Sequence, residues 1–360
     1  MIKAIKNLNF IRISYFIIIF IIIFYSKFSI SYEIYDSYFH HIEINTNNAL
    51  KTKNEEINKI KKKSLIIIIE KILDDNNKKI FKRKFNYTTD FDKIFKNMII
   101  ENEIITKDKY IADIKINFQK KDLISLLRFF KLDYSDNISD EYLIISSYTS
   151  NFSNFGLSKK NISYILMENN NINKKDYLIK FKLPKLNAND RFIVPYKNII
   201  NANLDSLYDI AKKYNNSNII ITNINENNTK ITTTNYFFNF STKKILLINR
   251  IDIKNNKFMI NEIFYSLNEW WKKNNQVNNI ILNKLLCTIQ SNRFSDLNYI
   301  RSKIKELSQF KSIITKSIEF NNNNELIEFF GDFNLLKQNL LRSKIAIKKE
   351  GDKCVILKIN

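Results

Sequence analysis

The sequence predicts a multidomain protein of the α+β and α/β classes. Apolar residues recur at helical spacing in some segments and alternate with polar residues in others, which indicates helices and half-buried strands. The chain has 360 residues, a length that suits two or three domains. We expect a small α+β domain at 32–134, a mixed-sheet α/β domain at 141–252, and a linking helix with a ferredoxin-like βαββαβ unit at 259–360.

The first 31 residues have the pattern of a secretory signal peptide. Positive residues precede an uninterrupted apolar run from Tyr15 to Tyr25, which is shorter than the roughly 20 residues that span a membrane. A small-x-small pattern ends at Ser31, so we predict cleavage there and a periplasmic or secreted product. The alternative is an uncleaved segment, 13–30, that anchors the protein in the inner membrane.

The first domain is expected to mix helices and strands. In its long helix, Ile57, Ile60, Ile68 and Ile72 recur at helical spacing, whereas residues 110–118 alternate as in a half-buried strand. The expected elements are an extended segment at 32–44, a helix at 49–73, a shorter helix from Asp90 through Met98, two strands within 103–118 and a helix at 120–131.

The middle domain is expected to pack helices against a mixed sheet. Asn203 is a suitable N-cap for the helix that follows it. The expected elements are a strand at 141–147, a loop with one helical turn at 149–176, a strand at 177–183 that ends at Pro184, a polar stretch to Asn201, a helix at 204–214, and strands at 218–222, 230–240 and 243–252.

The last block begins with an amphipathic helix at 259–273 and then follows a ferredoxin-like order with an extra hairpin strand. Gly331 and Asp332 mark the change from strand to helix, and Gly351 lies in a hairpin turn. The expected elements are strands at 279–290, 311–320, 325–330, 345–349 and 353–358, with helices at 295–307 and 333–344.

Composition excludes several kinds of chemistry. The chain has only 3 glycines and 2 prolines, and Lys, Asn and Ile are abundant, which indicates an A/T-biased genome. Nucleotide-binding loops and the serine-hydrolase elbow need clustered glycines that this chain lacks. The net charge of +22 comes mostly from dispersed lysines. We therefore expect no specific nucleic-acid partner, although weak attraction to anionic surfaces is possible.

We find no catalytic, cofactor-binding or metal-binding motif. His40 and His41 are adjacent on an extended segment, so their side chains point to opposite faces and cannot share a metal. Carboxylate pairs such as Asp74 and Asp75 are interpreted as solvated surface. We therefore expect a protein without a cofactor.

The 2 cysteines and the 2 tryptophans are interpreted structurally. Cys287 and Cys354 lie in apolar strands and are interpreted as core residues. The first and last strands of a ferredoxin-like sheet are neighbours, so a disulfide between these cysteines is the alternative. Trp270 and Trp271 are expected to fill a junction between domains rather than bind a ligand.

The order of several segments resembles the secreted proteobacterial family catalogued as domain of unknown function 2066. The segments are SLIIIIEKIL (64–73), KYIADIKINF (109–118), EYLIIS (141–146), YLIKFKLPKLNANDR (177–191), LYDIAKKYNNSNIIIT (207–222) and EFFGDFNLLKQNLL (328–341). This resemblance implies an extracytoplasmic protein of a Gram-negative bacterium, with no assigned catalytic residue. The middle block also looks like the TolB N-terminal type of domain, which implies docking to envelope partners.

The sequence leaves two classes of function open. We expect a periplasmic protein that binds envelope proteins as a scaffold or assembly factor without catalysis. The alternative is an envelope hydrolase whose site is assembled from scattered acids and hydroxyls. A cavity with convergent titratable groups, containing an Asp or Glu beside a Ser or Lys, would favour the hydrolase.

Overall fold

The computed structural model describes residues 34–87, 90–170, 176–227, 230–254, 258–319 and 321–359. These residues form a mixed α+β and α/β fold with separate hydrophobic clusters, in agreement with the predicted fold class. The predicted signal peptide and its cleavage site at Ser31 lie outside them. No described helix is both long and apolar enough to cross a membrane.

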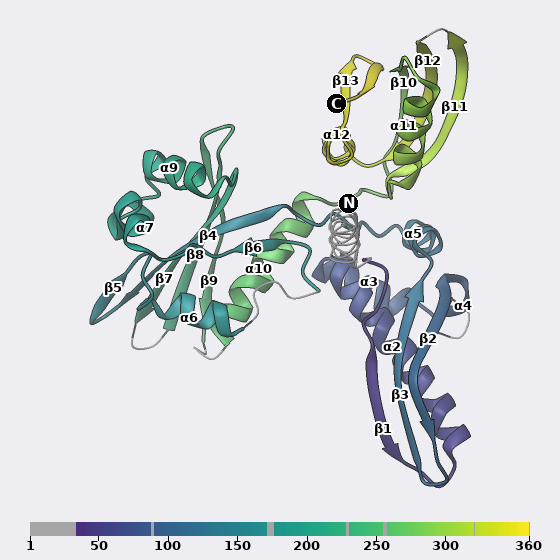
Figure 1. The fold of residues 1–360 in the computed structure, drawn as a ribbon, viewed down its shortest axis with the longest axis horizontal. Helices are drawn as coiled ribbons and strands as arrows, with labels where there is room; N and C mark the ends of the chain where they lie inside the picture. Colours follow the sequence, from purple (N-terminus) through teal and green to yellow (C-terminus); the bar gives the residue numbers. More distant parts are fainter. Residues whose placement is uncertain are drawn as a thin grey trace, which may run out of the picture.

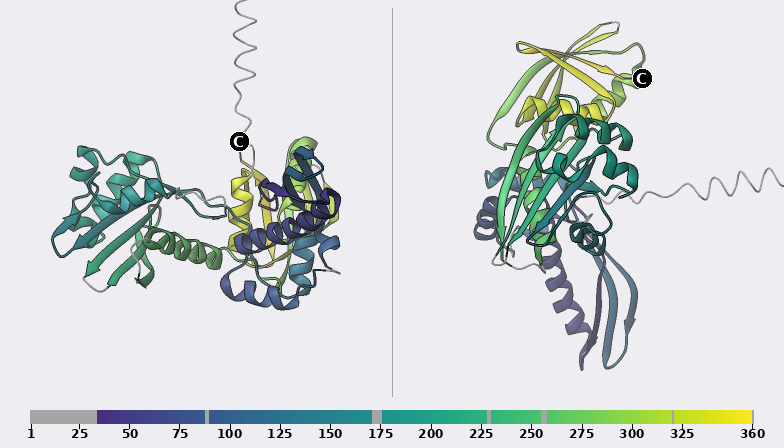
Figure 2. Two further views of the ribbon diagram at one scale, coloured as in Figure 1. Left: turned by 90° about the horizontal axis from the view of Figure 1, so that it is seen from below. Right: turned by 90° about the vertical axis from the view of Figure 1, so that its left-hand side faces the viewer.

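Three bodies are visible in Figure 1. We call them the N-terminal region (34–134), the middle region (136–275) and the C-terminal region (277–359). Each has its own cluster of buried hydrophobic residues. Figure 2 shows helix α10 (Met259–Asn274) extending from the middle region toward the other two.

The N-terminal region is a three-stranded antiparallel sheet with helices on one face. It contains β1 (His40–Asn45), α2 (Ala49–Ile72), α3 (Asp75–Lys84), α4 (Phe91–Ile94), β2 (Phe95–Ile105), β3 (Lys109–Phe118) and α5 (Lys120–Phe129). The strand order is β1-β3-β2. Ile68 of α2 packs in one cluster with Ala112 and Ile114 of β3, all of them fully buried. The opposite face of this sheet carries polar and charged side chains such as His41 and Asp113.

Residues 95–98 form a strand rather than the end of a helix. The prediction of a helix from Asp90 through Met98 is therefore wrong, because α4 ends at Ile94 and the chain continues as strand β2. Phe95 pairs with Phe118 in the β2–β3 ladder, and Phe91 packs edge-on against Phe118 with the ring centroids 5.8 Å apart. Pairing with a distant strand therefore overrides the local helical pattern.

The middle region has a sheet in the order β5-β4-β7-β8-β9, with β6 paired to β4. Strand β4 runs parallel to β6 and β7, and the other pairs are antiparallel. The elements are β4 (Glu141–Ser150), β5 (Ser153–Phe155), α6 (Ile162–Asn169), β6 (Lys180–Lys182), α7 (Ala188–Ile193), α8 (Tyr196–Ile200), α9 (Leu204–Tyr214), β7 (Asn218–Asn227), β8 (Lys230–Asn239) and β9 (Lys244–Ile253).

The structure differs from the predictions at several points in this region. Strand β4 continues to Ser150 and β7 to Asn227, because the two strands pair as far as Ser150 and Glu226. The predicted loop at 149–176 contains β5 and the eight-residue helix α6, and the strand predicted at 177–183 is limited to β6.

The polar stretch after Pro184 contains helices α7 and α8, and α7 begins with a capping box between Asn187 and Asp190. Helix α10, which the sequence groups with the C-terminal block, packs Ile263 and Leu267 into the core of the middle region.

The C-terminal region has a five-stranded sheet in the order β11-β12-β10-β14-β13. Its elements are β10 (Leu282–Gln290), α11 (Phe294–Glu306), β11 (Phe310–Glu319), β12 (Asn322–Phe330), α12 (Phe333–Arg342), β13 (Ile345–Glu350) and β14 (Lys353–Lys358). Strand β14 lies between β10 and β13 and runs parallel to β10. Apolar residues of α11 and α12 pack in one cluster with inward residues of the strands, so both helices cover the same face (Figure 1).

Candidate functional site

A cavity of about 510 Å³ lies where the N-terminal region meets the middle region. Helices α2 and α3 form one wall, and α10 with the segment before β6 forms the other. Its ionisable lining residues are Glu70, Asp75, Lys78, Lys79, Lys82, Asp176, Tyr177, Tyr265 and Lys272. A concave site with several ionisable side chains is what the hydrolase alternative requires. Whether these side chains could act in catalysis depends on the partners that each of them binds.

Local helix geometry brings these groups together. Asp74 caps α3 by accepting a hydrogen bond from the backbone N–H of Asn77 at 2.8 Å. Asp75 and Lys78 then lie one turn apart on the same side of α3, with Lys78 Nζ 2.7 Å from Asp75 Oδ1. On α10, Tyr265, Glu269 and Lys272 follow a helical spacing that places them on one side of the helix.

A group of paired charges connects α3 to α10. The hydroxyl of Tyr265 donates to Asp75, and Lys78 Nζ donates to the same hydroxyl at 3.2 Å. Lys78 also lies 3.7 Å from Glu269. Glu269 in turn accepts a hydrogen bond from the backbone N–H of Asp75 at 3.2 Å. Each of these four side chains therefore has at least one partner on the other helix.

The pKa values of Asp75, Lys78 and Tyr265 are shifted in directions that make these side chains less reactive at neutral pH. Burial, followed by the hydrogen bond to Asp75, raises the pKa of Tyr265 to about 12. Burial is the largest single effect and opposes the charges of Asp75 and Lys78, but their mutual hydrogen bond, their hydrogen bonds to Tyr265 and nearby opposite charges together outweigh it. As a result the pKa of Asp75 is lowered and that of Lys78 is raised. Neither Lys78 nor Tyr265 is thereby activated as a base or nucleophile.

Lys272 connects α10 to the end of α2. Its side chain is 1% exposed, and Nζ donates to the backbone carbonyls of Glu70 at 2.6 Å and Leu73 at 3.0 Å. The remaining N–H donates to Glu269 at 2.8 Å. Burial lowers the pKa of Lys272, and Glu269 opposes that effect. A cation at the C-terminal end of a helix is favourable because the free carbonyls carry negative partial charge.

Lys71, near the end of α2, has a depressed pKa. Burial is the main cause that lowers the pKa of Lys71 to about 8, and the charge of Asp176 acts in the opposite direction. A lysine with such a pKa can serve as a general base. However, Lys71 is only 3% exposed and is not among the residues that line the cavity. Its position favours a structural role.

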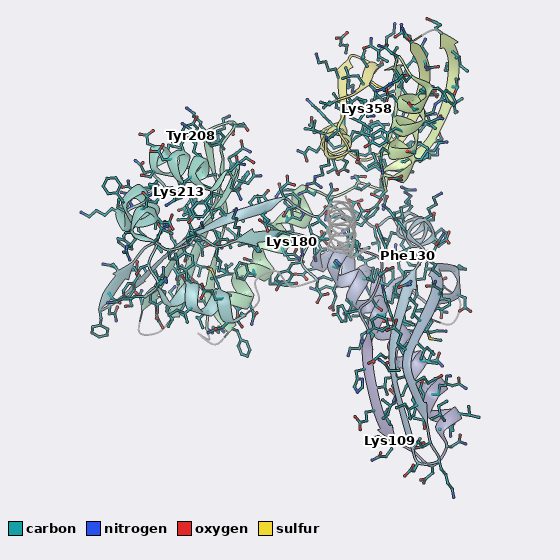
Figure 3. All side chains as sticks on the ribbon, in the orientation of Figure 1. Lys109, Phe130, Lys180, Tyr208, Lys213 and Lys358 are labelled. Carbon is teal, nitrogen blue, oxygen red and sulfur yellow. A yellow bond between two sulfur atoms is a disulfide. The ribbon has the colours of Figure 1, made fainter. Side chains whose placement is uncertain are left out.

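A second buried ion pair lies far from this cavity. Asp190 is fully buried, 2.7 Å from Lys213 Nζ, and it accepts a hydrogen bond from Tyr214 at 2.8 Å. Figure 3 places Lys213 and Tyr208 at the far side of the middle region, whereas Lys180 lies near the junction. Asp190 belongs to the capping box of α7, so this pair holds α7 against α9.

Cys287 and Cys354 form a disulfide. They lie directly opposite each other in the parallel β10–β14 pair, with Cα atoms 4.3 Å apart. Both are buried beneath α11 and α12. The disulfide cross-links neighbouring strands of one sheet and offers no thiol for chemistry.

The tryptophans pack against the sheet of the middle region, close to the junction. The rings of Trp270 and Trp271 lie edge-on to Tyr142, at 6.4 and 5.9 Å, and Trp270 also contacts Phe237. The indole N–H of Trp271 donates to the carbonyl of Asn137 at 2.7 Å. Asn137 lies in the link between the N-terminal and middle regions, so Trp271 helps to hold that link.

The other positions that the sequence singled out are structural. Gly331 has φ +82°, and a Cβ there would lie 3.1 Å from the backbone nitrogen of Asn278. Asp332 caps α12 by accepting from the backbone N–H of Asn334. Pro184 is buried shortly after β6, which ends at Lys182. None of these residues lines the junction cavity.

The sequence analysis did not identify the junction residues. Glu269 and Lys272 flank the tryptophans on α10, and a one-turn Glu–Lys spacing is also common on solvated helix surfaces. The side chain of Asp75 is exposed, as the sequence predicts, although it also bonds to Tyr265 of another region. The prediction of a solvated surface is wrong for Asp74, which is buried where it caps α3. Within the described ranges, no group of three or more His, Cys, Asp or Glu side chains could hold a metal ion.

No protein-family model and no curated protein matches the sequence. Among solved structures, the chain is similar to the C-terminal domain of LpoB from Salmonella enterica. The sequence identity is 12% and the TM-score is 0.24, over 38% of this chain and 96% of that domain. A likeness at this TM-score carries no argument about function.

Proposed function

We propose that the chain is a periplasmic protein of the cell envelope that binds other envelope proteins as a scaffold or assembly factor, without catalysis. The observation that carries this proposal is that the charged and phenolic groups that α3 and α10 bring together at the junction bind one another. Asp75, Lys78, Tyr265, Glu269 and Lys272 are all bonded to one another or to helix ends. They hold two regions in a defined arrangement and leave other surfaces for partners.

Uncovered surfaces for such partners exist in each region. Among the described residues, the N-terminal and C-terminal sheets have helices on one face only. In the middle region, β9 is an edge strand on which Leu246 and Leu247 are 57% and 62% exposed. Uncovered sheet faces and edges are common sites of protein recognition. The envelope location is supported by the signal-like leader and by the resemblance to the secreted family.

Site-specific photo-crosslinking in cells tests the binding function. A crosslinking residue replaces His41, Leu246 or Thr288, one for each region, and adducts are identified by mass spectrometry. We expect at least one position to give a reproducible adduct with a specific envelope protein, which must bind again when both proteins are purified. The absence of a specific protein adduct from all three positions would contradict the proposal.

The hydrolase alternative rests on Asp75 beside Lys78 and on Lys71. Activity measurements on the purified protein test it. Purified protein is incubated with isolated cell envelopes, and soluble products are measured for wild type, Asp75→Asn and Lys71→Met. We expect no turnover by any of them. Turnover by wild type that is abolished in both variants, with unchanged circular dichroism, would favour the hydrolase.

N-terminal sequencing of the protein from fractionated cells separates the two locations. A soluble periplasmic chain that begins at Tyr32 agrees with cleavage after Ser31. A membrane-bound chain that retains residues 13–30 would instead favour the anchored form.

A further inference from the structure

The uncovered face of the C-terminal sheet has a hollow of about 520 Å³, which we call the C-terminal hollow. Leu286 of β10 and Leu326 of β12 form its apolar floor. Lys316 of β11 and Lys353 of β14 lie at its two sides. The hollow thus spans four neighbouring strands, and it lies in a region that contributes nothing to the junction cavity.

Strand alternation explains why this face is open. Leu285 and Cys287 point toward α11 and α12 and are almost fully buried. Leu286 between them points to the opposite face and is 38% exposed. On the neighbouring strand β11, Ile314 is 46% exposed and pairs with Leu326 in the ladder. The result is a row of apolar side chains that no helix of the described residues covers.

The polar side chains of the hollow are already bonded to one another. Thr288 donates to Asn324 Oδ1 at 2.8 Å, and Asn324 Nδ2 donates to Ser317 Oγ at 2.8 Å. This chain of hydrogen bonds crosses β10, β12 and β11 and fixes the three side chains. The groups left for a ligand are therefore the leucine floor and the lysine ammonium groups.

The lysines of this face carry excess positive charge. Within the described part of the chain, no carboxylate forms an ion pair with Lys316, Lys348 or Lys353. By contrast, Glu328 at the margin of the same face is already held by Lys284 at 2.8 Å and by Lys311 at 3.4 Å.

The spacing of the lysines sets the size of the ligand. Lys316 and Lys353 lie on strands three positions apart, or roughly 14 Å at about 4.8 Å per strand. A ligand that meets both cations must therefore carry anionic groups on either side of an apolar segment.

We propose that the C-terminal hollow binds an acidic protein segment whose apolar side chains rest on Leu286 and Leu326 and whose carboxylates meet Lys316 and Lys353. This inference rests on the proposed binding function and names the chemistry of its partner. A polynucleotide fits less well, because none of the described residues that line the hollow is aromatic and could stack on bases. Opposite charges across the interface would steer the encounter and select the partner.

The first experiment is photo-crosslinking in cells from Thr288→benzoylphenylalanine in the full chain. Mass spectrometry maps the attached segment. It is compared between the parent, the hollow variant Lys316→Glu/Lys353→Glu, and the control Lys305→Glu/Lys337→Glu. The control makes the same charge change on exposed positions of the covering helices α11 and α12.

We expect an attached segment that contains Asp or Glu beside apolar residues. The adduct should fall at least tenfold in the hollow variant and stay within twofold of the parent in the control. An equal loss in both variants, or a segment without acidic residues, would overturn the inference. If His41 or Leu246 positions still capture a partner while position 288 captures none, the inference fails but the proposed binding function stands.

A second experiment separates a protein ligand from a membrane surface. The purified full chain is titrated with labelled peptides of alternating Leu and Glu or alternating Leu and Lys, and with phosphatidylglycerol vesicles. We expect binding of the acidic peptide at least tenfold tighter than of the basic one, weakened by salt and lost in the hollow variant. Binding only to vesicles, lost in the hollow variant, would assign the face to lipid and overturn the proposal.

Discussion

The N-terminal and C-terminal sheets share an architecture but differ in the charges of their uncovered faces. On the N-terminal sheet, Lys109 pairs with Glu43 at 2.6 Å, and His41 lies 2.8 Å from Asp113. On the C-terminal sheet, Lys284 and Lys311 share Glu328, but Lys316, Lys348 and Lys353 form no ion pair with a carboxylate among the described residues. The comparison shows that a uniformly basic composition conceals one face that is internally neutralised and another that can attract an acidic partner.

The two regions also differ in what stabilises them. The N-terminal region relies on a neighbour, because Lys272 of α10 bonds to the carbonyls at the end of α2. The C-terminal region carries its own cross-link between β10 and β14. The Lys272 contact and the disulfide can be removed by separate substitutions. The stability of each region can therefore be tested without changing the feature that stabilises the other.

The largest expected effect is from Lys272→Met. The substitution keeps the apolar stem but removes three hydrogen bonds and leaves Glu269 without its closest cation. Breaking a buried ion pair costs about 3–5 kcal/mol, so we expect a loss of that order in the free energy of unfolding of the N-terminal region. Hydrogen exchange of the α2 and α3 amides, followed with increasing denaturant, measures it.

Lys273→Met is the matched control, because Lys273 is exposed on the same turn of α10. We expect it to change stability by less than about 0.5 kcal/mol. Equal effects of the two substitutions would show that the N-terminal region does not depend on this anchor.

Removal of the disulfide should have a smaller effect, confined to the C-terminal region. The bond closes a loop with a sequence separation of 67 residues, and such bonds stabilise by about 2–4 kcal/mol. We expect Cys287→Ala/Cys354→Ala to speed hydrogen exchange in β10 and β14 and to leave α2 unchanged. Faster exchange in α2 as well would mean that the two regions are not independently stabilised.

The smallest effect concerns pH and the N-terminal region. Burial, together with the positive charge of Lys63, lowers the pKa of His40, whose Nε2 lies 3.0 Å from Ser64 Oγ. The folded state therefore favours the neutral ring. Its stabilising contribution is present above the unfolded pKa near 6.5 and is lost as the pH falls through that value toward the folded pKa.

Denaturation at pH 7.5 and pH 5 measures this contribution. We expect His40→Gln to remove part of the acid-induced loss of stability, whereas His41→Gln, at an exposed neighbouring position, retains it. An identical pH dependence of the two variants would refute the assignment to His40.

Much of the fold could be predicted from local patterns. The alternation in residues 110–118 indicated β3, and the helical spacing from Ile57 to Ile72 indicated α2. The helix boundary near Asp90 was wrong, because strand β2 forms by pairing with β3 rather than from its own pattern. Helices α7 and α8 were missed since they are short and polar, although the Asn187–Asp190 capping box was a usable signal.

The candidate site could not be predicted in the same way. Asp75 and Tyr265 are 190 positions apart in the chain, and their hydrogen bond depends on how two regions dock. The sequence pattern around a charged residue is the same whether the residue lies between two packed regions or is exposed to solvent. For the same reason, the lack of carboxylate partners at Lys316 and Lys353 was invisible beside the many other lysines.

The sequence by itself determined the class of fold and many of its helices and strands, because these depend on local spacing of apolar residues and on turn signals. Only the tertiary structure decided which charged side chains form ion pairs within the protein and which can instead bind a partner. It placed Lys272 against the end of α2, set Cys287 opposite Cys354, and left Lys316 and Lys353 around an apolar floor. These outcomes depend on contacts between distant segments, whose geometry no local pattern contains.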